Sequence, residues 1–359
     1  MRDDGKREAA IMRILRLVAP GTALREGVEN VLRARTGGLI VLGYDASIEA
    51  LIDGGFSIQT DFSPARLYEL AKMDGAIILS EDGRRILFAN TQLNPDASIP
   101  SRETGTRHRT AERVARQTGR LVLCISQRRH VITLYQEDVR YVLKDLNVIA
   151  GRANQALQTL ERYKTVLDAA LANLSALEIE EAVMLQDVIA ALQRFEMVMR
   201  IREEIRLYIT ELGTEGRLVS MQLEELVSRV DEEVYLLVKD YTAPLLDVSP
   251  SEILDGIHAL DAEDLLKGAV IASSLGYVNA ANFAEQSVSS RGYRILHKIP
   301  RLPQPVIENL AEEFPTIGSI VSASMQELDE VDGIGEVRAR AIKEGLRRVQ
   351  EQAAMERHV

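Results

Sequence analysis

The chain has 359 residues, enough for two or three domains with cores of their own. Hydrophobic residues make up 46% and charged residues 27%, as in ordinary globular proteins, while scarce aromatic residues (4%, no Trp) beside abundant Ala, Leu, Glu and Arg favour helices. The net charge of −11 excludes a protein that coats nucleic acid over its whole surface, so any nucleotide or nucleic-acid site must be local.

Cysteine usage and the N-terminus exclude several further classes. Cys124 is the single cysteine, so neither an intrachain disulfide nor a cysteine-based metal cluster can form. It lies in the apolar run 121–125 and is expected to be a buried core thiol. The N-terminus has no apolar signal-peptide core, and no run approaches the roughly 18 apolar residues of a membrane span. We therefore expect a cytoplasmic protein.

Strands and helices alternate over residues 1–145, which predicts an α/β domain with a mixed sheet. Helices are expected over 7–18, from Thr22 as N-cap, from Ser63-Pro64, and between Gly105 and Gly119. Strands are expected at 39–42, 56–58, 76–80, 86–89, 121–125 and 131–135, with the turn Glu81-Asp82-Gly83 joining two of them into a hairpin. The loop from Asn90 to Gly105 is long for a compact domain, and long loops are often functional.

The middle of the chain has a different sequence pattern. Residues 145–245 have no proline before Pro244 and carry long amphipathic patterns, which predict extended helices serving as a spine or an oligomerisation element. The heptad is not kept strictly, so a continuous two-stranded coiled coil is disfavoured. Short helices are expected from Ser249-Pro250 to Ile299.

Gly333-Ile334-Gly335 lies between two short predicted helices near the C-terminus. This is the arrangement of a helix-hairpin-helix, in which the hairpin amides and the start of the second helix can bind a DNA phosphate. Arg338, Arg340 and Lys343 follow and favour DNA as the ligand. The alternative is an αα-hairpin with a glycine-rich turn.

Charge limits this DNA interpretation. Residues 301–359 contain seven Lys and Arg against eleven Asp and Glu, a net charge of −4. Binding would have to use a basic face from Arg338 to Arg348. Affinity for plain duplex is therefore expected to be modest and strongly dependent on salt.

The segment Gly105-Thr106-Arg107-His108-Arg109-Thr110 lies at the start of a predicted helix. Unpaired amides and the helix dipole favour an anion there, and the forked guanidinium groups of Arg107 and Arg109 suit phosphate oxygens. The pattern predicts a polyphosphate pocket. From these residues alone, the alternative is a solvated basic helix end with Thr106 as its N-cap.

Asp74 is the candidate partner of this anion pocket. It precedes Gly75 at the start of a predicted strand, where a carboxylate can reach a loop-bound ligand, hold Mg²⁺ and assist deprotonation of a sugar hydroxyl. Taken alone, Asp-Gly is a common turn. Paired with the basic segment 105–110 in one small domain, it favours chemistry on a nucleotide.

Asp74-Gly75-Ala76 and Gly105-Thr106-Arg107-His108-Arg109 resemble the two signature motifs of the diadenylate cyclase family. With the helical middle and the C-terminal hairpin, the resemblance extends over essentially the whole chain to the members of this family that scan DNA integrity. It implies three parts, a cyclase domain over 1–145, a helical linker over 146–300 and a helix-hairpin-helix domain over 301–359.

The resemblance also implies an activity. Two ATP molecules would be condensed into cyclic di-AMP with release of two pyrophosphates, with Mg²⁺ or Mn²⁺ as cofactor. The protein would be a bacterial, nucleoid-associated homo-octamer whose cyclase domains meet face to face. Its C-terminal domains would bind branched DNA such as Holliday junctions, which suppresses synthesis as part of a DNA-damage response.

Roles for single residues follow from the same resemblance. Asp74 would position the metal or the attacking 3′-hydroxyl, and Gly75 and Leu93 would contact adenosine. The phosphates would be held by Thr106, Arg107, His108, Arg109 and Thr110, with Ser126 and Arg129 as additions.

Two details of the motifs qualify these roles. Other branches of the family carry Ser-Glu-Glu where this chain has Ser126-Gln127-Arg128-Arg129, so the sequence identifies no second carboxylate for the metal. His108 lies between two arginines that would lower its pKa, which favours a binding or orienting role over a protonic one.

The product's two-fold symmetry supports the face-to-face arrangement, because each 3′-hydroxyl attacks the other nucleotide's α-phosphorus. Two half-sites facing each other across a symmetric interface would align both nucleophiles. Two other functions stay open: a non-catalytic DNA-binding scaffold that senses ATP, and a different nucleotidyltransferase. The latter is disfavoured because the chain has no Gly-Ser…Asp-x-Asp carboxylate pair.

Overall fold

The computed structural model describes residues 2–243, 246, 248–277 and 280–356. The chain divides into two compact units, one of Met1–Gln155 with Ile205–Met221 and one of Ala156–Glu204 with Gln222–Val359. The expected domain boundaries after residues 145 and 300 stay predictions. In the part of the chain that is described, no helix has the length and apolar character needed to cross a membrane.

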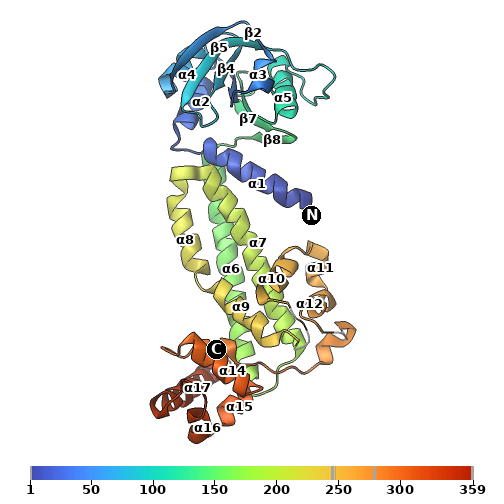
Figure 1. Cartoon of the computed structure of the whole chain (residues 1–359), viewed down its shortest axis with the longest axis vertical. Coiled ribbons are helices and arrows are strands. Elements are labelled where there is room, and N and C mark those ends of the chain that lie inside the picture. Colours follow the sequence, from blue (N-terminus) through green and yellow to red (C-terminus); the bar gives the residue numbers. More distant parts are fainter. Residues whose placement is uncertain (1, 244–245, 247, 278–279, 357–359) are drawn as a thin grey trace. The chain divides into compact units, whose positions relative to one another are not determined.

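The first unit is built on one mixed sheet, as predicted, and this sheet has eight strands where six were expected (Figure 1). The strands are β1 (Gly38–Leu42), β2 (Ile52–Asp53), β3 (Phe56–Asp61), β4 (Ala76–Leu79), β5 (Arg85–Leu93), β6 (Leu121–Ser126), β7 (Val131–Gln136) and β8 (Val139–Val142). Their order is β2-β5-β4-β1-β6-β7-β8, and β3 also pairs with β5. Only β1 and β4 run parallel, and the other pairs are antiparallel.

Helices cover both faces of this sheet. The helices of the domain are α1 (Arg2–Leu17), α2 (Ala23–Arg33), α3 (Ala46–Glu49), α4 (Pro64–Leu70) and α5 (Thr106–Thr118). One apolar cluster joins the end of α1, α2 and α4 to alternate strand residues such as Ile40 and Ile77. The other joins α3 and α5 to the intervening residues, among them Val41, Ile78 and Cys124. The two-residue period of the strands therefore divides the core into two layers.

Local sequence signals set the helix ends as predicted. The Thr22 hydroxyl accepts a hydrogen bond from the Arg25 amide at 3.2 Å, and Ser63 caps α4 in the same way before Pro64. Gly119 ends α5 with φ of 70°, a left-handed conformation that favours glycine. Gly119 thus sets the C-terminal end of α5, whose first turn carries the predicted anion site.

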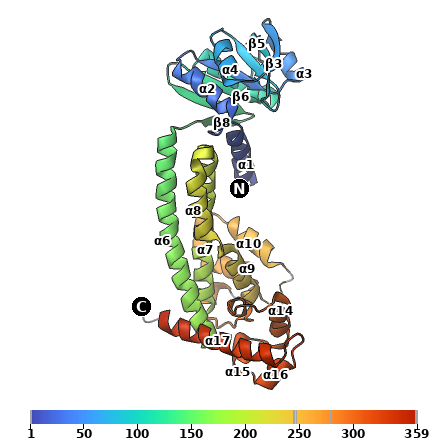
Figure 2. The ribbon, with the colours of Figure 1, turned by 90° about the vertical axis from the view of Figure 1, so that its left-hand side faces the viewer.

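Helices make up the rest of the described chain. They are α6 (Leu146–Ile179), α7 (Leu185–Leu212), η1 (Gly213–Gly216), α8 (Arg217–Val227), α9 (Val230–Tyr241), α10 (Pro250–His258), α11 (Ala262–Leu266), α12 (Gly268–Ser274), η2 (Ala280–Glu285), α13 (Tyr293–His297), α14 (Gln304–Glu313), α15 (Ile317–Ser322), α16 (Met325–Asp329) and α17 (Glu336–Glu356). Figure 2 shows α6 and α17 as long, continuous helices. The extended helices predicted for the middle of the chain are confirmed, although Pro244 lies outside the described residues.

A fully buried ion cluster braces the second unit. Arg294 is 1% exposed and donates to Glu178 at 2.5 Å, and Glu178 also accepts from the Tyr241 hydroxyl at 2.9 Å. Asp240 accepts hydrogen bonds from the backbone amides of Tyr293 and Arg294 at the start of α13. The cluster thereby ties α6, α9 and α13 together.

Three features of the first domain differ from the sequence prediction. The loop predicted from Asn90 is shorter, because β5 continues to Leu93 in antiparallel pairing with β2 and β4. Helix α3 was not predicted, because four residues capped by Asp45 show no helical period. Strand β8 was also missed, because its residues are only partly buried and do not alternate.

Candidate nucleotide-binding site

The predicted site residues of the first domain gather at one edge of the sheet. Leu39 of β1 pairs with Ala76 of β4 in parallel register, so Gly37 and Asp74 precede the two strands at matching positions. Parallel neighbours in a sheet lie about 4.8 Å apart. Asp74 is exposed and forms no ion pair with a described residue, so its carboxylate is open to a ligand.

Gly75 brings this edge of β4 close to β5. Its φ is +91°, and a Cβ there would lie 2.8 Å from the Asn90 carbonyl carbon and from the Thr91 oxygen. Thr91 also donates its hydroxyl to the Ala76 carbonyl at 3.0 Å. Only glycine fits this conformation and this space, so Gly75 fixes where Asp74 lies.

Helix α5 begins with no side-chain cap. Its N-cap is Gly105, and no side chain among the described residues accepts from the first amides of the helix. The prediction of Thr106 as N-cap is therefore wrong, because Thr106 is already the first helical residue. A glycine cap leaves these amides for another acceptor, which agrees with the prediction of an anion at this helix end.

Arg107 extends from this first turn back to the sheet edge. Its Nη1 lies 2.6 Å from the position that a Cβ on Gly37 would take. The side chain is half-buried, and no described carboxylate forms an ion pair with it. Because Gly37 and Asp74 precede neighbouring strands, the uncompensated guanidinium and the free carboxylate belong to one site.

His108 is buried and belongs to a hydrogen-bonded chain that the sequence analysis did not predict. Its Nδ1 lies 2.9 Å from the Tyr135 hydroxyl, which donates to Glu103 Oε1 at 2.8 Å. Arg140 donates its Nε to the same oxygen at 2.7 Å, and Arg129 lies 3.8 Å from the other carboxylate oxygen. Residues of α5, β7, β8 and the loop before α5 meet here.

The contacts of His108 and Glu103 determine the charge that each side chain carries. Burial lowers the pKa of the His108 imidazole, the Glu103 carboxylate raises it, and the cations of Arg129, Arg140 and Arg107 lower it. The net effect is a lowered pKa, so the ring is neutral near pH 7. Burial raises the pKa of the Glu103 carboxyl, but hydrogen bonds from Arg140 and Tyr135 lower it more, which keeps Glu103 ionised. The predicted direction for His108 is confirmed, although burial is the main cause and Arg109 is not one.

The other predicted ATP contacts have different surroundings. Arg109 is exposed and turns back to the Glu103 and Thr104 carbonyls, both at 3.4 Å, while Thr110 is half-buried. Ser126 ends β6 beside this edge, and its hydroxyl accepts from the Arg129 amide at 3.2 Å. Leu93 is 7% exposed and packs in the core layer of α3 and α5, so a contact with adenosine there stays a prediction.

A metal at this site would depend on few protein ligands. Across the described ranges, no three His, Cys, Asp or Glu side chains lie together as a metal-binding group. Mg²⁺ is commonly held by one or two carboxylates together with substrate phosphates, so an exposed Asp74 suits a metal that arrives with a nucleotide.

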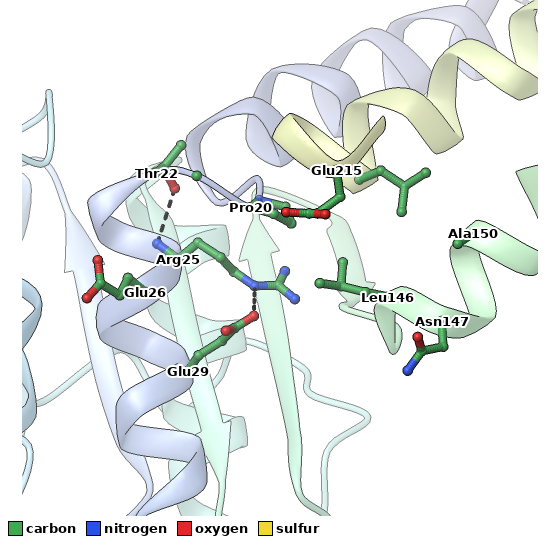
Figure 3. Close-up of a pocket in the computed structure, with 11 residues that line it drawn as sticks. Pro20, Thr22, Arg25, Glu26, Glu29, Leu146, Asn147, Ala150 and Glu215 are labelled. Carbon is green, nitrogen blue, oxygen red and sulfur yellow. Dashed lines mark hydrogen bonds and ion pairs between the residues drawn. The ribbon is translucent and has the colours of Figure 1, made fainter. Parts of the chain in front are cut away.

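A separate pocket of about 570 Å³ lies at the start of α2 (Figure 3). It is lined by Pro20, Gly21, Thr22, Arg25, Glu26, Glu29, Leu146, Asn147, Ala150, Leu212 and Glu215. Arg25 donates to Glu29 at 2.6 Å, which leaves the pocket with an excess of carboxylates. It contains none of the predicted site residues, and its charge disfavours a triphosphate.

The C-terminal hairpin residues lie in the second unit. Gly333 has φ of +79° in the turn between α16 and α17, and Ile334 is 6% exposed and packs in the core below that turn. Arg338 donates to the Gly333 carbonyl, Lys343 to the Val321 carbonyl at 2.7 Å, and Arg340 pairs with Glu336 at 3.2 Å. Of the three cations, Arg338 alone bonds the Gly333 turn, while Arg340 and Lys343 contact α17 and α15.

Comparisons with known proteins agree with this arrangement. Residues 25–140 match the family model described as DisA bacterial checkpoint controller nucleotide-binding, and residues 143–284 match the DisA bacterial checkpoint controller linker region. The DNA integrity scanning protein DisA of Carboxydothermus hydrogenoformans is 58% identical over 346 residues, 96% of this chain and 98% of that protein. The chain belongs to the DisA family.

A second DisA relative supports the same membership. DisA of Bacillus subtilis (strain 168) is 54% identical over 354 residues, 99% of this chain and 98% of that protein. Among solved structures, a double mutant of DacA from Staphylococcus aureus is 20% identical, with a TM-score of 0.29 over 40% of this chain and 91% of that chain. The resemblance found in the sequence motifs is thus confirmed at the level of the DisA family and its nucleotide-binding domain.

Four residues of the site lie outside the two sequence motifs, so sequence reasoning did not identify them. Gly37 stands in the Gly-Gly pair before β1, and its close contact with Arg107 spans 70 positions of the chain. Glu103, Tyr135 and Arg140 lie outside any motif. Glu103 stands in the predicted functional loop two residues before Gly105, which is the one signal that could have singled it out.

Proposed function

We propose that this member of the DisA family is a diadenylate cyclase that condenses two ATP into cyclic di-AMP and releases two pyrophosphates. The observation that carries the proposal is that Asp74 and Arg107 lie at the same end of the neighbouring strands β1 and β4. A free carboxylate and an uncompensated guanidinium are placed there beside uncapped helix amides. Phosphoryl transfer needs chiefly such positioning and charge stabilisation.

In this proposal the start of α5 binds the triphosphate. The free amides after Gly105 and the guanidinium of Arg107 would balance the charge on the α-phosphate and on the departing pyrophosphate. The 3′-hydroxyl of one nucleotide attacks the α-phosphorus of the other, which forms the phosphodiester bond and breaks the bond to pyrophosphate. Thr106, Arg109, Thr110, Ser126 and Arg129 are proposed as further phosphate contacts, and Gly75 and Leu93 as adenosine contacts.

Asp74 would hold Mg²⁺ or Mn²⁺ together with the nucleotide phosphates, or orient the attacking hydroxyl. When bound, the metal neutralises phosphate charge and favours departure of pyrophosphate. Exposure of Asp74, together with the absence of an ion pair between it and any described residue, supports either role. Gly75 keeps the carboxylate at the edge, because a larger residue would meet the β5 backbone.

The product requires two such sites. One cyclase domain presents one Asp74 and one Arg107 segment, whereas the two bonds of a cyclic dinucleotide form by reciprocal attack. We propose that two domains face each other across a two-fold axis, within a homo-oligomer that the resemblance predicts to be an octamer.

We further propose that the second unit ends in a helix-hairpin-helix that binds branched DNA and thereby lowers cyclase activity. The left-handed Gly333, the buried Ile334 and the cations Arg338, Arg340 and Lys343 on α17, the helix that follows the turn, support a phosphate contact there. The name of the relatives, DNA integrity scanning protein, supports the same role.

The test is a product assay on the full chain with ATP and Mg²⁺, analysed by chromatography with and without a four-way DNA junction. We expect cyclic di-AMP, less of it with the junction, and a loss of at least about a hundredfold in Asp74→Asn. Asp53→Asn is the matched control, because Asp53 is also an exposed aspartate followed by glycine and lies on β2. It should retain wild-type activity.

Two results would contradict the proposal. If the chain binds ATP but forms no cyclic dinucleotide, it is an ATP-sensing DNA-binding scaffold. If it forms linear oligonucleotides instead, it is a different nucleotidyltransferase. Equal activities of the wild type and Asp74→Asn would also remove Asp74 from the site.

A further inference from the structure

His108 is the buried end of the hydrogen-bonded series Glu103–Tyr135–His108. Its side chain is 8% exposed, and its Nε2 atom is buried with no hydrogen-bond partner among the described residues. The Cδ2 atom next to Nε2 lies 3.8 Å from where a Cβ on Gly105 would be, so this edge of the ring faces the uncapped start of α5.

The contacts of Tyr135 determine which nitrogen of His108 carries the proton. A phenol has one O–H, and Glu103 is an ionised carboxylate that can only accept, so the Tyr135 hydroxyl donates to Glu103. Its oxygen is then an acceptor toward His108, which must donate from Nδ1 across the 2.9 Å contact. In a neutral ring this leaves a lone pair, and no proton, on Nε2.

We infer that Glu103 and Tyr135 are positioning residues that hold the neutral His108 ring with its proton on Nδ1, so that Nε2 accepts a hydrogen bond from a ribose hydroxyl of the bound nucleotide. The inference rests on the proposed cyclase function. Glu103 and Tyr135 lie outside both sequence motifs. His108 would bind a ribose hydroxyl, whereas its arginine neighbours would bind phosphate.

The chemistry of ATP selects the hydroxyl. Phosphate oxygens are acceptors and cannot pair with a lone pair on Nε2, whereas the ribose hydroxyls and the adenine amine can donate. In the proposed reaction the α-phosphate at the start of α5 is approached by a ribose hydroxyl, which places this donor beside His108. A buried nitrogen without a partner is unfavourable, and a hydrogen bond from the hydroxyl removes that cost.

The binding test uses the full chain and nonhydrolysable α,β-methylene forms of ATP, 2′-deoxyATP and 3′-deoxyATP, each with Mg²⁺. Tyr135→Phe removes the acceptor for Nδ1 and frees the ring to change tautomer. We expect binding of the ATP form to weaken about fivefold, the equivalent of one ordinary hydrogen bond. One of the two deoxy forms should have the same affinity for the variant and for the wild-type protein. The hydroxyl that this form lacks is the one that binds Nε2.

Tyr141→Phe is the matched control, because it removes another tyrosine hydroxyl bonded to a buried glutamate, Glu211, in the same unit. Its relative affinities for the three nucleotides should equal those of the wild type. Equal weakening of all three by Tyr135→Phe, or no weakening, would overturn the inference. Wild-type product formation from ATP is assayed on the same preparation, so failure of the cyclase proposal is recognised separately.

A second measurement reads the tautomer without any nucleotide. In protein labelled with ¹⁵N-histidine, the His108 signals are assigned by their loss in His108→Gln. We expect a protonated Nδ1 and an unprotonated Nε2 at neutral pH in the wild type, and a mixture of tautomers in Tyr135→Phe. A protonated Nε2 in the wild type would overturn the inference even if the variant unfolds.

Discussion

The guanidinium of Arg107 lies against Gly37, with Nη1 2.6 Å from where a Cβ at that position would be. The contact joins the first turn of α5 to the start of β1, two elements that lie 70 residues apart in sequence. Gly37 has φ of +74°, and its missing side chain is the space that Arg107 occupies. The position of the central cation of the site therefore depends on a glycine outside both motifs.

Gly37→Ala is predicted to displace Arg107 and to lower cyclic di-AMP formation by about tenfold to a hundredfold, because small displacements in a phosphoryl-transfer site are costly. Gly54→Ala is the control. Gly54 has a similar φ of +64°, but a Cβ there would meet no atom within 4 Å. Both variants should lose a comparable ~1–2 kcal/mol of stability from backbone strain. Equal activities of the two variants would show that Arg107 does not depend on Gly37.

The metal role of Asp74 predicts a change of metal preference. Asp74→Cys replaces a hard oxygen ligand with a thiolate, which binds Mg²⁺ poorly and softer ions well. We expect no turnover with Mg²⁺ and partial recovery with Mn²⁺ or Cd²⁺, measured as cyclic di-AMP formed. Asp74→Ser is the control and should stay inactive with every ion. If no ion restores cyclic di-AMP formation in either variant, Asp74 orients the attacking hydroxyl and does not bind the metal.

The sequence was sufficient for features that are set by local chemistry. Thr22, Ser63 and Gly119 fix helix ends through caps that act within a few residues. The β4–β5 hairpin follows from Asp82-Gly83 between two apolar runs. The two motif segments could likewise be recognised, because each is short and continuous.

Features that depend on tertiary contacts could not be predicted in this way. Glu103 has its role only because Tyr135 and Arg140, 32 and 37 residues later, meet its carboxylate. The cause of the low His108 pKa could be predicted only in part, since the sequence neighbour Arg107 contributes, whereas burial and Arg129 act through the fold. The sequence marks Gly37 only as a strand boundary, whereas in the fold Arg107 occupies the space that a Gly37 side chain would take.

Cys124 is predicted to be inert in the folded protein. It is fully buried between β1 and β7, and burial raises the pKa of its thiol to about 12. The folded chain therefore keeps this proton at pH values where the unfolded thiol, with a pKa near 9.0, loses it, and stability decreases as pH rises above 9.0. A chromogenic disulfide reagent at pH 8 should detect no thiol in the native chain and one after denaturation. Rapid native labelling would contradict the burial.

The hairpin proposal can be tested by a substitution that the protein itself tolerates. A Cβ on Gly335 would meet no protein atom within 4 Å, so Gly335→Ala should leave the thermal midpoint unchanged. If a DNA phosphate approaches this backbone, the added methyl group will weaken binding to a four-way junction by about tenfold. Gly256→Ala on α10 is the matched control, because its Cβ also meets no atom within 4 Å.

Fluorescence anisotropy with a labelled junction at two salt concentrations measures both variants. Gly256→Ala should bind as the wild type does, and Gly335→Ala should lose affinity at each concentration while keeping the same salt dependence, because no cation is removed. Wild-type affinity in Gly335→Ala would mean that the DNA contacts another surface. In that case Arg338, whose side chain bonds the Gly333 carbonyl, stabilises the turn and does not bind phosphate.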